Sequence, residues 1–259
     1  MLNSDKVEKW HADGFIKLEG FFDGKTRDAI SDTVDEIAKW DVSADKWMMW
    51  FEKTKDNRKI VSKVENFLEY HDRLRELVLA DQRIKDCVEQ LLDEKTKMLK
   101  ELLIFKYPDS GGYRPHQDIY HIPHKLPDRM VHAVVSIAID DSEPENGGLF
   151  FSAGNHKKDV FKMDAGGVID PEIAKTFSWE PVHCKAGDIF IFDDYAPHYS
   201  EPNKSDRSRR TLYLVFQRES TAGPNRTEYN AMKRAYNPPE EKDYDINDLR
   251  PSNGIFYRD

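Results

Sequence analysis

The stretch GDIFIFDDYAPH, at residues 187–198, contains a turn, a short apolar run and then a histidine. The run Asp188–Phe192 has the length and the β-branched and aromatic content of a buried strand. Gly187 before it and Pro197 after it are residues that commonly bound such a segment. The stretch therefore predicts one strand of a sheet, followed by a candidate functional histidine, His198.

Similar short runs occur throughout the chain after Met98, separated by clusters of Gly, Pro, Asp and Asn. The other runs are Leu102–Tyr107, Met130–Ile139, Leu149–Ser152, Pro181–Cys184 and Arg210–Phe216. Several short strands that follow a block of helices favour a sheet-based core with helices packed on one side.

The first third of the chain has the spacing of amphipathic helices. Asp23 can cap a helix over Gly24–Trp40, and apolar residues recur three or four positions apart in Glu65–Ala80 and Gln82–Leu92. We expect all three to be packing helices. The apolar cluster Trp47–Phe51 lies between them, and we interpret it as core packing, with a lid or pocket wall as the alternative.

Length and composition exclude several classes of protein. The 259 residues suit one domain, with a helical part over about residues 1–97, a core over about 98–220 and an extension over about 221–259. The net charge of −9 argues against nucleic acid as a partner, and no apolar run is long enough to cross a membrane. Two cysteines, Cys87 and Cys184, and the absence of a secretory pattern at the start predict a cytoplasmic protein. The oligomeric state cannot be read from the sequence.

The motif HQD at residues 116–118 is the first candidate for chemistry. On extended backbone, His116 and Asp118 project to the same face. A further histidine such as His198 would complete two imidazoles and one carboxylate on one face of a metal, which suits Fe(II) that binds a co-substrate and oxygen together. By itself, the motif is better explained by chance or by a structural pairing of Asp118 with a histidine than by a metal site.

A polar loop, Glu201–Ser208, separates His198 from a strand that opens with Arg209 and Arg210. An arginine on a strand near an iron site offers a planar fork for a carboxylate, which a lysine matches less well. The alternative is a solvated basic loop that includes Lys204.

Taken together, these motifs resemble the phytanoyl-CoA dioxygenase family of Fe(II)/2-oxoglutarate oxygenases, over about Val7 to Phe216. The segments that carry the resemblance are Asp13–Ile16, Ser62–Phe67, Ile104–Gly111, His116–Asp118, Glu145–Leu149, Gly154–Lys157 and Gly187–His198. The order and spacing of these segments make the resemblance specific.

The resemblance implies that His116, Asp118 and His198 are the iron ligands. It also implies that Arg209 binds the distal carboxylate of 2-oxoglutarate.

Further co-substrate residues are implied in the same way. Arg210 and Arg207 are the alternatives to the arginine at position 209. Lys63 matches a family lysine that helps to hold 2-oxoglutarate, although it would equally suit a surface position before a helix. Ser200 stands where the family often has a serine near the co-substrate.

The implied fold is mainly β with flanking helices: a double-stranded β-helix, a cupin-like jelly roll, buttressed by the N-terminal helices. The implied activity is hydroxylation of an unactivated C–H bond with Fe(II), 2-oxoglutarate and O2, which yields succinate and CO2. Asp118 favours hydroxylation, because relatives that halogenate replace this carboxylate by a small residue. Desaturation and oxidative cyclisation remain alternatives.

We expect the substrate to be a small polar metabolite, either an amino acid or a natural-product intermediate. The acidic balance of the chain makes an acyl-CoA, with its phosphates, less attractive. Two other classes stay open: a non-catalytic relative that binds 2-oxoglutarate or another ligand, and a non-redox metal protein of the cupin type.

Overall fold

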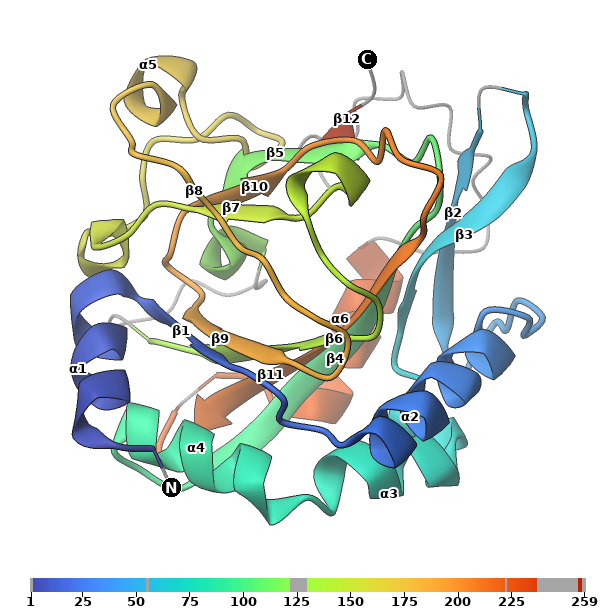
Figure 1. Cartoon of the computed structure of the whole chain (residues 1–259), viewed down its shortest axis with the longest axis horizontal. Helices are drawn as coiled ribbons and strands as arrows, with labels where there is room; N and C mark the ends of the chain where they lie inside the picture. Colours follow the sequence, from blue (N-terminus) through green and yellow to red (C-terminus); the bar gives the residue numbers. More distant parts are fainter. Residues whose placement is uncertain (1, 55, 122–129, 222, 237–255, 258–259) are drawn as a thin grey trace.

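Two antiparallel sheets form the centre of the protein (Figure 1). The computed structural model describes residues 2–54, 56–121, 130–221, 223–236 and 256–257. The larger sheet has the order β1-β9-β6-β11-β4-β3-β2, and the smaller sheet has the order β12-β5-β10-β7-β8. The strands of the larger sheet are β1 (Phe15–Leu18), β2 (Met48–Lys53), β3 (Lys59–Glu65), β4 (Thr96–Lys106), β6 (Ala133–Ala138), β9 (Ile189–Asp193) and β11 (Arg209–Arg218). Those of the smaller sheet are β5 (Gly112–His116), β7 (Leu149–Phe151), β8 (Glu180–Pro181), β10 (His198–Ser200) and β12 (Phe256–Tyr257).

The larger sheet is buried on both faces, and strand β4 shows why. Its side chains alternate, so that Leu103 and Phe105 enter one hydrophobic cluster while Leu102 and Ile104 pack against another. The first cluster lies between the sheet and the helices, and the second includes residues of the smaller sheet. The face that carries Leu102 and Ile104 is therefore the one that faces the smaller sheet.

Helices cover the outer face of the larger sheet (Figure 1). They are α1 (Ser4–Asp13), α2 (Gly24–Ile37), α3 (Asp72–Leu79) and α4 (Gln82–Leu92), with a short α5 (Pro171–Ala174) and a C-terminal α6 (Arg226–Tyr236) elsewhere. The Asp23 carboxylate accepts a hydrogen bond of 2.7 Å from the backbone N–H of Thr26, which confirms the predicted cap of α2. None of the described helices is long and apolar enough to cross a membrane.

This arrangement confirms the predicted fold class, a jelly-roll core buttressed by N-terminal helices. The six strands predicted after residue 98 are all present, with shifted ends. Strands β5, β10 and β12 are additions to that prediction, and β5 and β10 carry site residues.

The expected helical first third is partly wrong, because β1, β2 and β3 lie within it. The predicted helix Glu65–Ala80 does not exist as one element: Glu65 ends β3, and the helix begins only at Asp72. Asn66 has a φ of 58°, a left-handed conformation that neither a strand nor a helix continues through. The apolar spacing of this segment therefore belongs to two different elements.

The cluster Trp47–Phe51 belongs largely to β2, and the buried Met48, Met49 and Trp50 confirm core packing. Of the C-terminal extension, the structure describes α6 and β12, while residues 237–255 lie outside the described part of the chain.

Candidate metal centre

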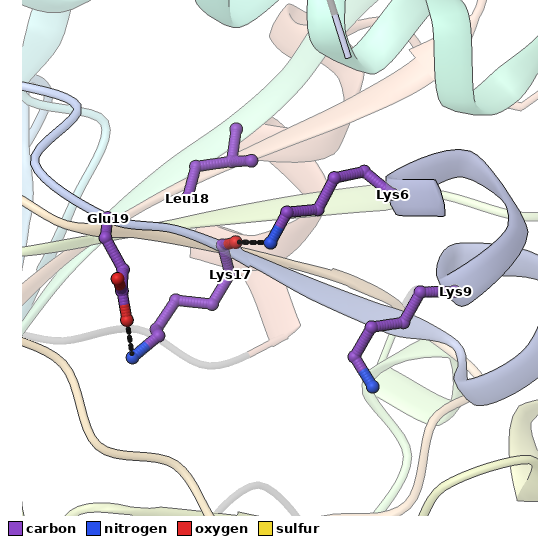
Figure 2. Close-up of a pocket in the computed structure, with 5 residues that line it drawn as sticks. All are labelled: Lys6, Lys9, Lys17, Leu18 and Glu19. Atoms are coloured by element: carbon purple, nitrogen blue, oxygen red, sulfur yellow. Dashed lines mark hydrogen bonds and ion pairs between the residues drawn. The ribbon is translucent and has the colours of Figure 1, made fainter. Parts of the chain in front are cut away.

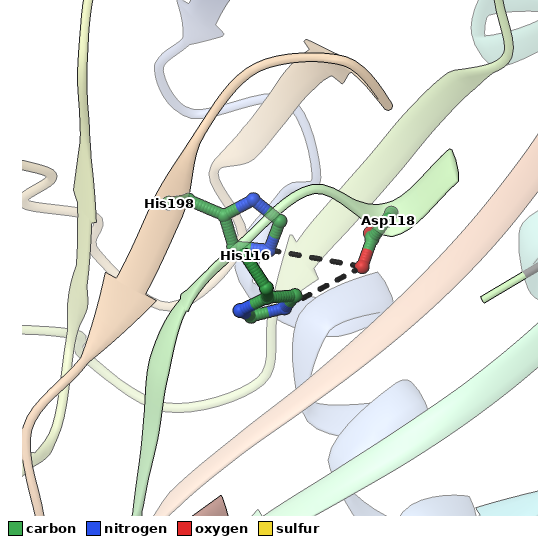
Figure 3. A group of neighbouring side chains, drawn as sticks. All are labelled: His116, Asp118 and His198. Atoms are coloured by element: carbon green, nitrogen blue, oxygen red, sulfur yellow. Dashed lines mark ion pairs between the residues drawn. The ribbon is translucent and has the colours of Figure 1, made fainter. Parts of the chain in front are cut away.

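His116, Asp118 and His198 come together between the two sheets (Figure 3). His116 is the last residue of β5, and its Cα is paired with that of His198, the first residue of β10. The Nε2 atoms of His116 and His198 lie 3.6 and 3.8 Å from Oδ1 of Asp118. One ligand atom from each residue lies within 4.8 Å of the other two.

The backbone of this motif differs from the expected extended form. Strand β5 ends at His116, and Asp118 begins a 3-10 turn, Asp118–His121. The turn, rather than the pleat of a strand, directs the carboxylate toward the two imidazoles (Figure 3).

Backbone carbonyls orient both imidazole rings. Nδ1 of His116 donates to the carbonyl of Arg114 at 2.6 Å, and Nδ1 of His198 donates to the carbonyl of Ala196 at 3.0 Å. A ring that donates through Nδ1 keeps the lone pair of Nε2 available for a metal. Phe151 stacks on the His198 ring with centroids 4.9 Å apart, which fixes the ring plane further.

Gln117 connects the HQD motif to the segment that precedes His198. Its side chain is fully buried, donates to the carbonyl of Tyr195 at 2.7 Å and accepts from the backbone N–H of Phe161 at 2.8 Å. Ile119, the residue after the HQD motif, donates its backbone N–H to the carbonyl of Asp194 at 3.1 Å. The HQD motif is thus bonded directly to the turn that leads into His198.

The donor set fits a divalent cation. Metal bonds to imidazole nitrogen and carboxylate oxygen are about 2.0–2.2 Å long, so one ion can reach atoms separated by the distances found here. Burial lowers the pKa of His198 to about 4, assisted by His116 and opposed by Asp118. Burial alone would raise the pKa of Asp118, but His198 and His116 lower it below its ordinary value. Neutral His198 beside an ionised Asp118 is the state that a metal requires.

Arg209 is buried at the start of β11, with only 2% of its surface exposed. Its Nη1 donates to Oγ1 of Thr211 at 3.2 Å, and its Nε has no hydrogen-bond partner among the described residues. A buried guanidinium with an unused donor is suited to an anionic ligand.

The two alternative arginines bind elsewhere. Arg210 pairs with Asp140 at 2.7 Å and with Asp35 at 2.6 Å, and Arg207 pairs with Glu143 at 2.9 Å. Because successive residues of a strand point to opposite faces, Arg210 lies on the opposite face of β11 from Arg209. Arg209 is therefore the arginine that faces the smaller sheet.

Ser200 is fully buried, two residues after His198 on β10. Its hydroxyl accepts a hydrogen bond of 2.7 Å from Nζ of Lys106, which also donates to the carbonyls of Glu201 and Gly147. Lys106 is paired across the sheet with Arg209. Burial and the Arg209 guanidinium hold the pKa of Lys106 well below its ordinary value.

Lys106 had no predicted role, although it lies within the family-like segment Ile104–Gly111. The alternation of β4 places it on the same face as Leu102 and Ile104, and this pattern could have identified it.

Lys63 also lies on the face of the larger sheet that meets the smaller sheet. Its Nζ is 3.0 Å from Glu65 and lies 4.1 Å above the ring of Trp50. Among the described residues, no hydrogen bond or ion pair joins Lys63 to Arg209 or Ser200. Its part in binding 2-oxoglutarate stays a prediction.

A separate hollow of about 440 Å³ lies between α1 and β1 (Figure 2). Its three lysines are already engaged: Lys17 pairs with Glu19 at 2.7 Å, Lys6 donates to the carbonyl of Lys17 at 2.7 Å, and Lys9 pairs with Asp13. None of the lining residues belongs to the His116–Asp118–His198 cluster, so we assign this hollow no part in the metal centre.

Comparison with known proteins bears on the same site. The family model described as phytanoyl-CoA dioxygenase (PhyH) matches residues 10–211, well over half of the chain. The chain is 37% identical to a methylphosphonate hydroxylase of Gimesia maris, over 90% of this chain and 87% of that protein. It is 30% identical to a 2-aminoethylphosphonate dioxygenase of an uncultured bacterium, over 97% of this chain and 95% of that protein. Its fold is similar to that of EctD from S. alaskensis, a structure with 2-oxoglutarate and 5-hydroxyectoine, with a TM-score of 0.74 and 20% identity over 86% of this chain and 78% of that one.

Proposed function

The chain belongs to the phytanoyl-CoA dioxygenase family and is an Fe(II)/2-oxoglutarate-dependent oxygenase, and we propose that it hydroxylates a small phosphonate. The observation that carries the substrate class is that two relatives, each similar over nearly the whole chain, are named for small phosphonates. This proposal narrows the expected small polar metabolite and replaces the amino acid or natural-product intermediate as the first choice.

We assign His116, Asp118 and His198 as the iron ligands, because they offer two oriented imidazoles and one carboxylate. When bound, the iron supplies, with 2-oxoglutarate and O2, the oxidation of a C–H bond, with succinate and CO2 as co-products. The protein's own contribution is to fix the three ligands through the carbonyl bonds to the rings and through Gln117.

We assign Arg209 and Ser200 to the distal carboxylate of 2-oxoglutarate. The guanidinium offers an unused donor, and Ser200 lies on the same strand as the ligand His198. Lys106 holds the Ser200 hydroxyl in place and adds positive character beside Arg209 when protonated. Burial of all three side chains excludes water and strengthens their bonds to an anion.

The proposed substrate class also bears on the type of reaction. The single carbon of methylphosphonate can be neither desaturated nor closed into a ring, so for that substrate hydroxylation is the expected reaction. The carboxylate of Asp118 favours the same outcome over halogenation. The complete set of His116, Asp118, His198 and Arg209 argues against a non-catalytic binding protein. The cytoplasmic location stays a prediction.

The test is an assay with Fe(II), 2-oxoglutarate, O2 and either methylphosphonate or 2-aminoethylphosphonate. We expect a hydroxylated phosphonate, detected by phosphorus NMR, in equal amount to the succinate released, and no product from His198→Ala. Succinate release that depends on an amino acid and on neither phosphonate would overturn the substrate class while leaving the enzyme class intact.

A further inference from the structure

Three lysines gather around one carboxylate on the face of the larger sheet that meets the smaller one. Glu65 lies 3.0 Å from Nζ of Lys63 and 3.9 Å from Nζ of Lys233. Lys100 interacts electrostatically with the same carboxylate. We call Lys63, Glu65, Lys100 and Lys233 the lysine cluster.

Two strands and one helix bring these residues together. Lys63 and Glu65 of β3 are paired with Ile104 and Leu102 of β4, and Lys100 precedes Leu102 by two positions on the same face. Lys233 comes from α6, which packs against β4. The cluster therefore depends on the C-terminal extension as well as on the sheet.

Ion pairs and hydrogen bonds hold helix α6 in this position. Arg226 forms ion pairs with Glu101 and Glu69, and Asn230 donates to the side chain of Asn66 at 2.7 Å. Arg234 donates to the backbone carbonyls of residues 44, 46 and 47. Tyr229 and Lys233, four residues apart on one side of the helix, are thereby fixed over β4.

The charges of the lysine cluster do not cancel. Lys63 forms the short pair with Glu65 and also stacks on Trp50, so its charge is balanced. Lys233 is more distant from Glu65, and no described carboxylate lies within ion-pair distance of Lys100. Two positive charges therefore remain in a largely buried region, where unbalanced charge is unfavourable unless a counter-anion is present.

Hydrogen-bond donors accumulate in the same place. Nε1 of Trp50 is buried and lacks a hydrogen-bond partner among the described residues. The buried hydroxyl of Tyr229 accepts from the Lys100 ammonium and still has its own proton to donate. Lys63 lies over the Trp50 ring, and Lys100 lies 5.2 Å from the centre of the Tyr229 ring. Buried donors of this kind are normally satisfied, so a ligand with several acceptor oxygens would suit them.

The lysine cluster lies beside the metal centre. Tyr229 packs in one hydrophobic cluster with Ile119, the residue that follows Asp118, and with Tyr195. The Lys100 ammonium also contributes to the low pKa of the Asp118 carboxyl. Lys63 and Lys233 remain 21% and 16% exposed, so the ammonium groups are not sealed from a small solute. A substrate anion in this cluster would lie on the face of the larger sheet that meets the smaller sheet, whose strands β5 and β10 carry His116 and His198.

We propose that Lys100 and Lys233 bind the doubly charged phosphonate group of the substrate, with Trp50 and Tyr229 as additional hydrogen-bond donors. Two surplus ammonium groups match a dianion in charge, and lysine is a common partner of phosphate-like oxygens. This assignment rests on the proposed function and names the residues that recognise the substrate class.

The pKa of Lys233 agrees with the assignment. Burial lowers it to about 8, Glu65 opposes the shift, and Lys63 and Lys100 add to it. Burial alone would also lower the pKa of Lys100, but Tyr229, Glu65 and Asp118 raise it above its ordinary value. A bound dianion would stabilise the protonated form of Lys233.

The test uses the iron-loaded enzyme and compares Lys100→Met, Lys233→Met and the control Lys95→Met, whose lysine is exposed and pairs with Glu89. We expect the KM for methylphosphonate to rise about 10- to 100-fold in the first two variants, the range for a lost bond to a charged group. The KM for 2-oxoglutarate should stay unchanged in both, and Lys95→Met should behave as wild type.

A second measurement separates charge recognition from a structural role. Methanesulfonate has the shape of methylphosphonate with a single negative charge, so wild type should bind it more weakly as a competitor. In Lys100→Met and in Lys233→Met, the affinities for methylphosphonate and methanesulfonate should be closer to each other than in wild type. A loss of packing would weaken the binding of both compounds alike. If Lys100→Met does not fold, as judged by its thermal unfolding, Lys100→Gln replaces it.

The outcomes distinguish this assignment from the proposed function. Turnover of methylphosphonate with wild-type KM in both variants would overturn the assignment and leave the function intact. If wild type binds methylphosphonate without turning it over, the proposed function fails. The affinity of the two variants for methylphosphonate, measured by calorimetry, then decides the assignment. A lower affinity than wild type supports the assignment, and an unchanged affinity overturns it. Absence of binding by wild type would overturn both.

Discussion

His116 and His198 lie directly opposite each other across the ladder between β5 and β10, although they are far apart in the sequence. The pairing fixes the distance between the two imidazoles, and the turn that begins at Asp118 adds the carboxylate from the side. The site is therefore part of the sheet itself, and its geometry follows from strand register.

The carboxylate of Asp118 should be required for iron binding. We predict that Asp118→Ala abolishes turnover and weakens Fe(II) binding, because one of three protein ligands is lost and the described residues add no other carboxylate to the group. Equilibrium dialysis against Fe(II) measures the affinity. Asp32→Ala removes an exposed carboxylate of α2 and should bind iron as wild type does. Normal turnover by Asp118→Ala would contradict the ligand assignment.

Gln117 should act by positioning the metal motif. Gln117→Leu leaves the carbonyl of Tyr195 and the N–H of Phe161 without their partner, at a cost of about 1–3 kcal/mol for each buried group. We expect a lower midpoint of thermal unfolding and weaker Fe(II) binding together. Gln82→Leu, at an exposed glutamine of α4, is the control. A stability loss with unchanged iron affinity would show that the link to Tyr195 does not position the ligands.

Arg209 and Arg210 are neighbours with opposite roles. We predict that Arg209→Ala raises the concentration of 2-oxoglutarate needed for half-maximal rate by about 10-fold or more, since a charge-assisted bond is lost. Arg210→Ala should instead lower stability through the lost pairs with Asp140 and Asp35, without changing the 2-oxoglutarate requirement. Steady-state rates at varied 2-oxoglutarate concentration and the midpoints of thermal unfolding, measured for both variants, test this difference in role. The reverse pattern would mean that the register of β11 has been misread.

Binding of the phosphonate should weaken at alkaline pH. Lys233 carries its charge below its pKa of about 8 and loses it above, while Glu65 stays ionised with its pKa of about 2. The other groups that face Lys233 are Lys63 and Lys100. We expect the KM for methylphosphonate to rise between pH 7 and pH 9 in wild type. The substrate itself also ionises with pH, and this affects wild type and Lys233→Met alike. The difference between the pH profiles of KM for the two proteins therefore reports the ionisation of Lys233. Parallel profiles would contradict this role.

The metal motif could be predicted because its residues are local or belong to a recognisable pattern. HQD occupies three consecutive positions, and the histidine that completes the cluster follows an apolar strand whose composition is distinctive. The family resemblance had already favoured Arg209 over Arg210, and the register of β11 supplied the physical reason for that choice.

The remaining features depend on long-range packing. Strand β3 was missed because its pattern runs into the helical spacing of the following residues, and the change of backbone direction at Asn66 leaves no mark in that spacing. No motif in the sequence marks Lys100 or Lys233. They come together only because α6, which carries Lys233, packs against β4, which carries Lys100. The net charge of −9 had argued against an acyl-CoA substrate with its phosphates, yet the lysine cluster gathers three ammonium groups around one carboxylate. Overall charge describes the surface and does not describe a buried site.

The measurement that tests the account most directly is an anaerobic titration of the metal-free protein with Fe(II) and then with 2-oxoglutarate. The visible absorption band of iron chelated by 2-oxoglutarate is the signal. We predict that the band forms in wild type, is absent from His198→Ala, and needs more 2-oxoglutarate in Arg209→Ala. Iron binding without the band in wild type would contradict the account, as would a band of full intensity in His198→Ala.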